Sequence, residues 1–261
     1  MKRYVLTCLL IIIYSVLSIP VSAQNTEEVG IDEQLGKTVP LDTRFVTSTG
    51  DTVTMKQVID KPVLLALVYY ECPGICSPML NDLSWVMDRM ELEPGTDYKA
   101  VSLSFDYRET PAIAAKWKKN YLHSIKRNFP DSDWVFLTGD SVNIKKFTDA
   151  VGFHFKPTKD SNYVHAATVI AISPEGKISR YLFGIQFNPF DMKMALLEAK
   201  AGKSNPTITK VLQLCFSYDP AGRRYTVDVT RIAGVVMLLA LGIFTMTVVL
   251  KKKKVKKNEG V

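Results

Sequence analysis

The chain has 261 residues and a formal net charge of +7, but the excess charge is confined to its two ends. Residues 1–23 hold two basic residues, and residues 251–261 hold six lysines and one glutamate, which leaves 25 basic and 25 acidic residues between them. A neutral central part has no general electrostatic reason to bind nucleic acid, so we expect no nucleic-acid partner.

The first predicted element is a secretory signal peptide over residues 1–23. Lys2 and Arg3 precede a largely apolar run over 4–19, and the small residues Val-Ser-Ala at 21–23 are typical of a cleavage site. This layout predicts that the mature protein lies outside the cytoplasm, and it argues against a cytosolic enzyme.

The next stretch of sequence, residues 24–90, predicts a hairpin, a strand and a helix after a polar lead-in. Residues 24–40 are polar and predict a mobile lead-in, whereas residues 41–54 alternate around a turn-rich cluster and predict a hairpin. The continuous apolar run at 63–70 is typical of a strand that is buried on both faces. Apolar residues spaced three and four apart predict a helix over 79–90.

Strands and helices continue to alternate along the rest of the domain. Further strands are expected at 98–105 and 134–137, helices at 111–128, 142–151 and 189–200, and a hairpin at 165–172 and 177–182. This order predicts an α/β domain over residues 24–202, in which helices flank a mixed sheet.

The C-terminal part predicts a membrane anchor. Residues 203–231 form a membrane-proximal segment with a possible small hairpin, and residues 232–250 carry no charge. Nineteen helical residues span about 28 Å, close to the ~30 Å of a bilayer core. The lysines of 251–261 predict a cytoplasmic tail, which places the domain outside a bacterial-type inner membrane as a single-pass protein.

Three cysteines remain after removal of the signal peptide, because Cys8 lies within it. Cys72 and Cys76 follow the buried strand and are only four residues apart, so a disulfide between them closes a very small loop and adds little stability. Such a pair favours redox or metal chemistry over a structural role. Cys215 has apolar neighbours and is interpreted as a buried or membrane-proximal thiol, with a further-ligand or resolving role as its alternative.

Two thiolates need a third ligand to make a convincing metal site, and the chain offers three histidines. His123 lies among lysines and arginine on a predicted helix, where a solvated face is expected, and His154 lies between two phenylalanines in a predicted loop. His165 opens a predicted strand, whose end can lie beside the cysteine turn in a layered fold. His165 is therefore the candidate ligand, although a histidine at a strand start is also commonly structural.

A Cys₂His donor set favours a soft or borderline transition metal. Thiolates select Cu(I), and imidazole also suits Cu(II). Zinc accepts the same donor types, but its structural sites usually use four protein ligands, and the sequence offers three.

The order of three motifs resembles the Sco/SenC family of thioredoxin-fold copper chaperones. Residues 72–76 (Cys-Pro-Gly-Ile-Cys) resemble the family's Cys-Pro-x-x-Cys motif, and residues 102–111 are similar to its Ser-x-Asp-Pro-x-Arg-Asp-Thr-Pro segment. Residues 163–165 (Tyr-Val-His), followed by a strand and residues 174–176 (Pro-Glu-Gly), resemble its ligand-histidine region. The chain departs from the family at Glu109, where Asp is usual, and at Val164, where Asp often precedes the histidine.

This resemblance implies a thioredoxin-like fold and a copper site formed by Cys72, Cys76 and His165. It also implies delivery of copper to the copper-bearing subunit of cytochrome c oxidase, or to another copper protein. An alternative is a thiol–disulfide oxidoreductase whose redox pair, Cys72 and Cys76, acts on cysteines of a partner protein. Asp106 and Arg108 follow a predicted strand near this site, either as an ordinary surface ion pair or as a docking edge.

Overall fold

The computed structural model describes residues 29–204, two short stretches at 216–219 and 224–227, and the single positions 237, 241, 242 and 244. The short stretches form the strands β12 (Phe216–Asp219) and β13 (Arg224–Val227), which pair antiparallel within the segment for which the sequence predicts a small hairpin. Among all these described residues, no helix combines the length and the apolar character that a bilayer crossing requires.

Several sequence predictions lie outside the described residues. They are the signal peptide (1–23), the basic tail (251–261), Cys215 and, apart from the four single positions, the membrane span (232–250). The anchor and the signal peptide therefore stay predictions from the sequence.

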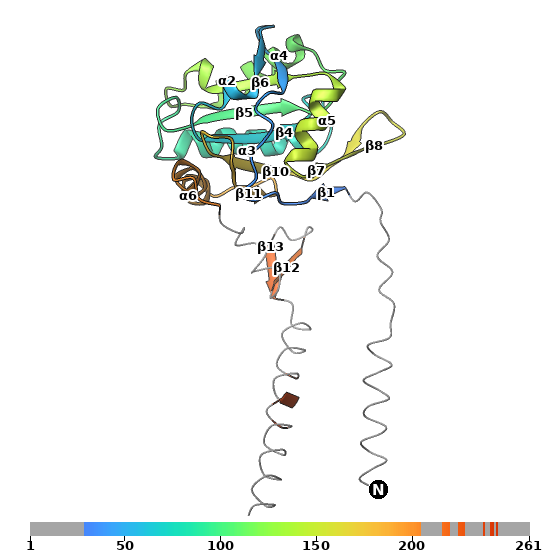
Figure 1. Ribbon diagram of the computed structural model, residues 1–261, viewed down its shortest axis with the longest axis vertical. Coiled ribbons are helices and arrows are strands. Elements are labelled where there is room, and N and C mark those ends of the chain that lie inside the picture. Colours follow the sequence, from blue (N-terminus) through green and yellow to red (C-terminus); the bar gives the residue numbers. More distant parts are fainter. Residues whose placement is uncertain are drawn as a thin grey trace, which may run out of the picture.

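The centre of the fold is a seven-stranded mixed sheet with the order β11-β10-β4-β5-β6-β2-β3 (Figure 1). Its strands are β2 (Arg44–Thr47), β3 (Thr52–Thr54), β4 (Val63–Val68), β5 (Lys99–Ser104), β6 (Trp134–Thr138), β10 (Thr168–Ile172) and β11 (Ile178–Phe183). The strands β4, β5 and β6 run parallel, whereas β10 is antiparallel to both β4 and β11. At the other side β2 is antiparallel to both β6 and β3.

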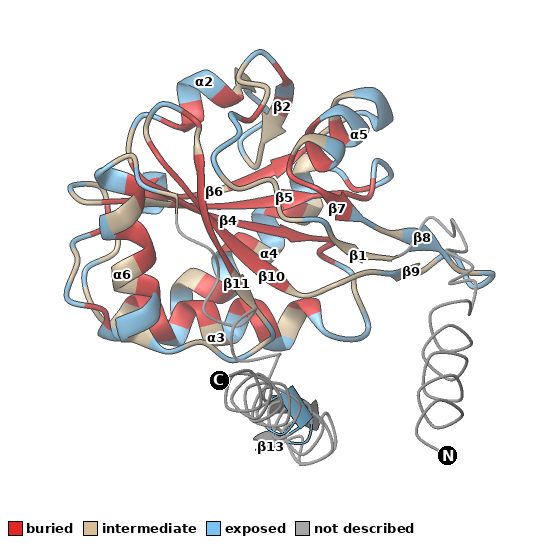
Figure 2. Cartoon of the chain, turned by 60° about the horizontal axis from the view of Figure 1, so that its bottom comes forward, coloured by how far each residue is buried: buried red, intermediate tan, exposed pale blue. Residues whose placement is uncertain are grey.

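Helices cover both faces of this sheet (Figure 2). The helices are α2 (Met55–Val58), α3 (Cys76–Arg89), α4 (Pro111–Ser124), α5 (Ser141–Ala150) and α6 (Pro189–Lys200), with a 3₁₀ turn η1 (Asp131–Asp133). The helix α3 packs against both α4 and α6 on one face, and α5 lies over the other. Three two-residue strands, β7 (Phe153–His154), β8 (Lys156–Pro157) and β9 (Tyr163–Val164), follow α5.

The core lies between the sheet and these helices. All six residues of β4 are buried, as the apolar run predicted, and aromatic side chains fill the space around it. The largest fully buried side chains include Trp134, Tyr70, Tyr98 and Phe105. The predicted α/β domain with a mixed sheet and flanking helices is confirmed, and its arrangement fits the thioredoxin-like class.

Two helix boundaries differ from the sequence prediction, each for a local reason. The helix α3 begins at Cys76 rather than at residue 79, because Pro78 lies in its first turn, where the missing N–H has no intrahelical partner to lose. The helix α4 ends at Ser124 rather than at residue 128. The backbone N–H groups of Lys126 and Arg127 instead donate to the Asp88 carboxylate at 2.7 and 2.9 Å.

From residue 29 the polar lead-in has fixed hydrogen-bond partners in the domain, which corrects the expectation of a mobile segment. Its first strand, β1 (Gly30–Ile31), pairs with β7, and the Asp32 N–H donates to the Gly152 carbonyl at 2.8 Å. Further on, the N–H of Gly36 donates to the carbonyl of Ile178 at 2.9 Å. These partners lie far away in the sequence, so no local pattern of apolar residues could indicate them.

The contact between the lead-in and Gly152 predicts a stability difference between two glycines. A Cβ on Gly152 would lie 1.8 Å from the Asp32 carbonyl oxygen, whereas a Cβ on Gly202 would meet nothing within 4 Å; both glycines have positive φ, 64° and 63°. We expect Gly202→Ala to cost about 1 kcal/mol from the backbone conformation alone. Gly152→Ala should cost about 3 kcal/mol or more, since the lead-in must also move.

Urea unfolding of the two variants measures both free energies. Equal losses of stability in the two variants would contradict the close approach of residue 32.

Candidate metal centre

The candidate site lies at one edge of the sheet, where three chain segments meet. The cysteine loop (residues 69–75) leaves the carboxyl end of β4, and the loop between β5 and α4 (residues 105–110) leaves the carboxyl end of the adjacent parallel strand. The strand β10 runs antiparallel to β4, with Val169 opposite Ala66. Its amino end therefore lies at this same edge, and it carries the histidine loop (residues 158–165).

The two cysteines occupy different environments. Cys72 is half-buried in the cysteine loop, and its Sγ accepts a hydrogen bond from the Gly74 N–H at 3.3 Å. Cys76 is the first residue of α3 and only 1% exposed. Both are free thiols in the structure.

His165 lies between β9 and β10 and points at the cysteines. The predicted strand begins at Thr168, so the histidine precedes it by a short irregular stretch. The imidazole Nε2 lies 3.4 Å from the Cys76 Sγ, and Nδ1 lies 2.9 Å from the Ala166 carbonyl oxygen. A carbonyl oxygen accepts only, so Nδ1 is the protonated nitrogen, and Nε2 presents its lone pair to the site.

The ring of His165 is held by aromatic neighbours. Its centroid lies 5.7 Å from that of Tyr69 and 5.0 Å from that of Phe105, with both rings edge-on to it. The ring centroid of Phe153 lies 6.1 Å from that of the imidazole. The imidazole is therefore confined to a small range of orientations.

These elements bring the three expected side chains together. One ligand atom from each of Cys72, Cys76 and His165 lies within 4.8 Å of the other two, which is close enough for all three to bind one ion. Within the described part of the chain, no other group of three such side chains is gathered in this way.

The two thiols also have opposite protonation preferences. The hydrogen bond from the Cys76 thiol is the main cause that lowers the pKa of Cys72, and the Gly74 N–H adds to it against the effect of burial. Donation of this hydrogen bond, together with burial, raises the pKa of Cys76. The metal-free site therefore holds one thiolate, at Cys72, and one thiol.

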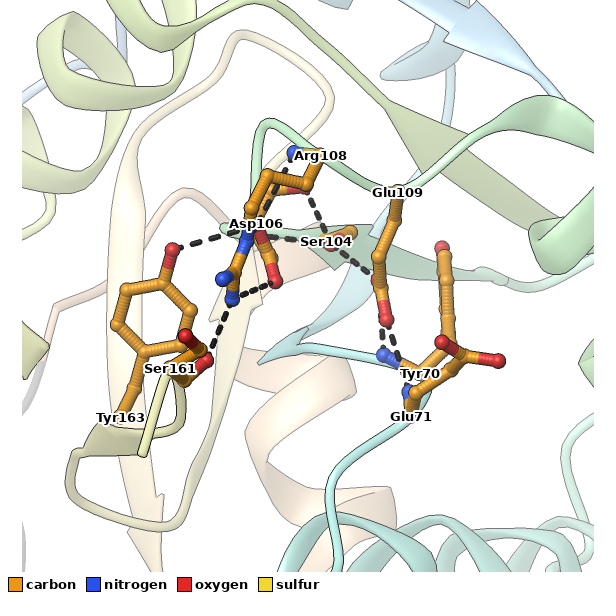
Figure 3. A network of polar contacts seen from close by, with 8 residues as sticks. All are labelled: Tyr70, Glu71, Ser104, Asp106, Arg108, Glu109, Ser161 and Tyr163. Carbon is orange, nitrogen blue, oxygen red and sulfur yellow. Dashed lines mark hydrogen bonds and ion pairs between the residues drawn. The ribbon is translucent and has the colours of Figure 1, made fainter. Parts of the chain in front are cut away.

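A buried carboxylate fixes the start of the cysteine loop. Glu109 accepts hydrogen bonds from the backbone N–H groups of Tyr70 and Glu71, each at 2.8 Å, and from the Ser104 hydroxyl at 2.6 Å (Figure 3). Burial raises the pKa of Glu109 despite these three donors. The two residues before Cys72 are thus tied to the loop between β5 and α4.

The remaining candidates from the sequence lie elsewhere. His123 is exposed on α4, in agreement with the expectation of a solvated face, and His154 is exposed in the short strand β7 rather than in a loop. Asp106 and Arg108 form an ion pair beside the histidine loop, with the Asp106 side chain only 7% exposed. They are therefore more than an ordinary surface pair.

Sequence reasoning missed the residues that support the ligands. Tyr69 and Phe105 read as apolar residues near the ends of predicted strands, and Glu109 as a variant position in a motif. The one available signal was position: each follows, within a few residues, a strand that ends at the site.

Comparison with known proteins identifies a family for most of the chain. The SCO1/SenC family model matches residues 32–198. The SCO1 protein homolog of Bacillus subtilis is 24% identical over 154 residues, which cover 56% of this chain and 75% of that protein.

Solved structures have the same fold. A crystal structure from Aquifex aeolicus, provisionally described as an electron transfer protein, is 27% identical with a TM-score of 0.58, and the match covers 64% of this chain and 95% of that one. Arabidopsis thaliana ScoI with copper bound is 20% identical with a TM-score of 0.51, covering 63% and 97%; this likeness concerns the fold alone.

The lowered pKa of Cys72 predicts its reactivity. Alkylation by iodoacetamide requires the thiolate, so an ordinary thiol with a pKa near 8.5 reacts about tenfold more slowly for each pH unit below that value. Because the pKa of Cys72 lies below its usual value, its rate should stay near its plateau as the pH falls from 8 to 6.

A variant of Cys76 tests whether the Cys76 thiol causes the lowered pKa of Cys72. Cys76→Ala removes the thiol that donates to Cys72, so the fall in rate should move to higher pH. Mass spectrometry of the reduced, metal-free protein locates the modified residue. A rate at Cys72 that follows the pH profile of an ordinary thiol would rule out the stabilised thiolate.

Proposed function

The chain belongs to the SCO1/SenC family, and we propose that it is a metallochaperone that binds one copper ion through Cys72, Cys76 and His165. The observation that carries the proposal is the convergence of two thiol sulfurs and an imidazole nitrogen within 4.8 Å. The ligands lie inside the part of the chain that the family model matches.

The donor set fits copper. Thiolate ligands stabilise Cu(I), and an added imidazole lets the same site hold Cu(II). A structural zinc site would need a fourth protein ligand, and the gathered group contains three side chains. Copper is thus the ion that this combination of soft sulfur and imidazole donors suits best.

Each ligand contributes in a different way. Cys72 is already a thiolate and is half-exposed, so it offers the first attachment point for an incoming ion. Cys76 gives up its proton on binding, since the thiolate is the ligand form. His165 directs Nε2 at the cysteines, because its other ring nitrogen, Nδ1, is held by the Ala166 carbonyl.

The acceptor and the location are proposed from the sequence. The family resemblance supports the copper-bearing subunit of cytochrome c oxidase, or another copper protein, as the acceptor. The signal peptide over 1–23, the apolar stretch over 232–250 and the lysines after it support a single-pass protein in a bacterial-type inner membrane. The domain would then face the periplasm or the cell exterior, with the C-terminus in the cytoplasm.

Copper binding should depend on all three ligands. We expect the purified, reduced protein to bind one copper ion and to show thiolate-to-Cu(II) charge-transfer absorption. The double variant Cys72→Ser, Cys76→Ser should lose both. His165→Ala should weaken copper binding by about tenfold or more, since even an outer partner of a ligand can have an effect of that size.

His123→Ala is the matched control, because His123 is an exposed histidine on α4. It should bind copper as the wild-type protein does, by metal analysis and by competition with a chromophoric chelator. Stoichiometric copper in the double cysteine variant would refute the proposed site.

A thiol–disulfide oxidoreductase is the second candidate, and the pair of free thiols with one thiolate favours it. In that reaction Cys72 attacks a disulfide of the partner, and Cys76 then displaces the partner's sulfur. The partner's disulfide becomes two thiols, while Cys72 and Cys76 become a disulfide. Recycling requires a dithiol reductant, which would be a separate protein.

A transfer experiment separates the two functions. When the Cu(I)-loaded protein is mixed with a metal-free, reduced copper-bearing subunit, copper should move while Cys72 and Cys76 stay reduced. Metal analysis of the separated proteins shows where the copper is, and thiol counting by mass spectrometry shows whether Cys72 and Cys76 are still reduced. An oxidised subunit that gains two thiols while the metal-free protein gains a disulfide would instead favour the oxidoreductase.

A further inference from the structure

The histidine loop needs an external support. The loop contains β9, which pairs only with β8 directly before the loop, and each of these strands has two residues; within the loop the Thr158 N–H donates to the Asn162 carbonyl at 2.8 Å. Ser161 at its tip has a φ of 60°, a left-handed conformation that is uncommon for a residue other than glycine. So short a hairpin is marginal by itself in water.

Arg108 supplies contacts to this loop from the loop between β5 and α4. Its Nη2 donates to the Ser161 carbonyl at 2.7 Å, at the tip of the histidine loop. Its guanidinium carbon lies 5.3 Å from the centroid of the Tyr163 ring, two residues before the histidine. One side chain therefore contacts the histidine loop at two points (Figure 3).

Asp106 holds that guanidinium in place. Arg108 donates from Nε to Oδ1 at 2.7 Å and from Nη2 to Oδ2 at 2.6 Å, which is a bidentate pair with a fixed orientation. The Tyr163 hydroxyl also donates to Oδ1, at 3.2 Å. The backbone N–H of Asp106 donates to the hydroxyl of Ser104, the last residue of β5, at 3.1 Å. The backbone that carries the Asp106 carboxylate is therefore fixed to the end of that strand.

The charge of this pair is retained at neutral pH. Burial by itself would raise the pKa of the Asp106 carboxyl, but the hydrogen bonds and the charge of Arg108 outweigh it and leave that pKa lowered. A typical exposed ion pair contributes little, yet here the carboxylate is buried and the pair joins segments more than fifty residues apart.

We propose that Arg108, oriented by Asp106, is a positioning residue for His165: it fixes the histidine loop so that the imidazole faces Cys72 and Cys76. The proposal deepens the copper-binding function and rests on it for its consequence in metal affinity. Its structural part, the ordering of the loop, concerns the metal-free protein.

The first test is amide hydrogen exchange of the reduced, metal-free protein. In Arg108→Gln, amides of the histidine loop should exchange about tenfold faster than in the wild type, while those of β4 and β10 keep their rates. Lys145→Gln is the matched control, because it breaks an exposed ion pair with Asp149 on α5. It should leave the histidine loop unchanged.

The second test is copper binding by the same proteins. Arg108→Gln should weaken copper affinity by about tenfold and reduce the nitrogen coupling of His165 in the electron paramagnetic resonance spectrum of the Cu(II) form. Arg108→Lys should not restore either property, since an ammonium group cannot reproduce the two parallel bonds to Asp106. Lys145→Gln should match the wild type in both.

A milder variant covers the case in which Arg108→Gln does not fold. Tyr163→Phe removes only the hydroxyl that donates to Asp106, so loop exchange should rise by roughly threefold with unchanged circular dichroism. If Arg108→Gln folds, unchanged amide exchange of its histidine loop would overturn the proposal. If only Tyr163→Phe folds, unchanged amide exchange of the histidine loop in that variant would overturn it. Faster exchange with unaltered copper affinity and nitrogen coupling would overturn it as well.

If the wild type binds no copper, the proposed function fails, whereas the exchange experiment still decides whether Arg108 orders the loop. The two failures are therefore distinguishable.

Discussion

The site depends on one pairing in the sheet, that of β10 with β4. These strands are antiparallel, with Val169 opposite Ala66, so the amino end of β10 lies beside the carboxyl end of β4. Residues 89 positions apart, Cys76 and His165, consequently meet at 3.4 Å. The pairing is secured by burial, because every residue of both strands lies in the packed core, where a change of volume or position is felt by the neighbouring side chains.

The loop between β5 and α4 connects the two halves of the site. From one end of this loop, Glu109 binds the backbone that leads into Cys72, and from the middle, Asp106 and Arg108 bind the loop that leads into His165. Three adjacent strands of the sheet, β10, β4 and β5, thus support the site through three loops at a single edge. A rigid sheet with ligands on its loops is a common way to hold a site in place while leaving it open to solvent.

The sequence predicted the architecture well because its signals were local. The apolar run at 63–70 is continuous, the helix at 189–200 is bounded by Pro189 and by Gly202, and the structure contains β4 and α6 in those places. Donor chemistry and the family motif predicted that Cys72, Cys76 and His165 form one site. The support for these ligands was not predictable, because Glu109 and Arg108 act through backbone groups of segments distant in the sequence. The order in residues 29–40 was missed for the same reason.

The unequal exposure of the two cysteines sets an order of approach. Cys76 is covered by the first turn of α3 and the imidazole, whereas Cys72 lies in an open turn between exposed residues. A molecule that arrives from solvent meets Cys72 first, whether it brings a metal ion, a thiol or a disulfide. Binding at the site is therefore ordered: an incoming molecule contacts the Cys72 sulfur first and reaches the Cys76 sulfur and the His165 imidazole afterwards.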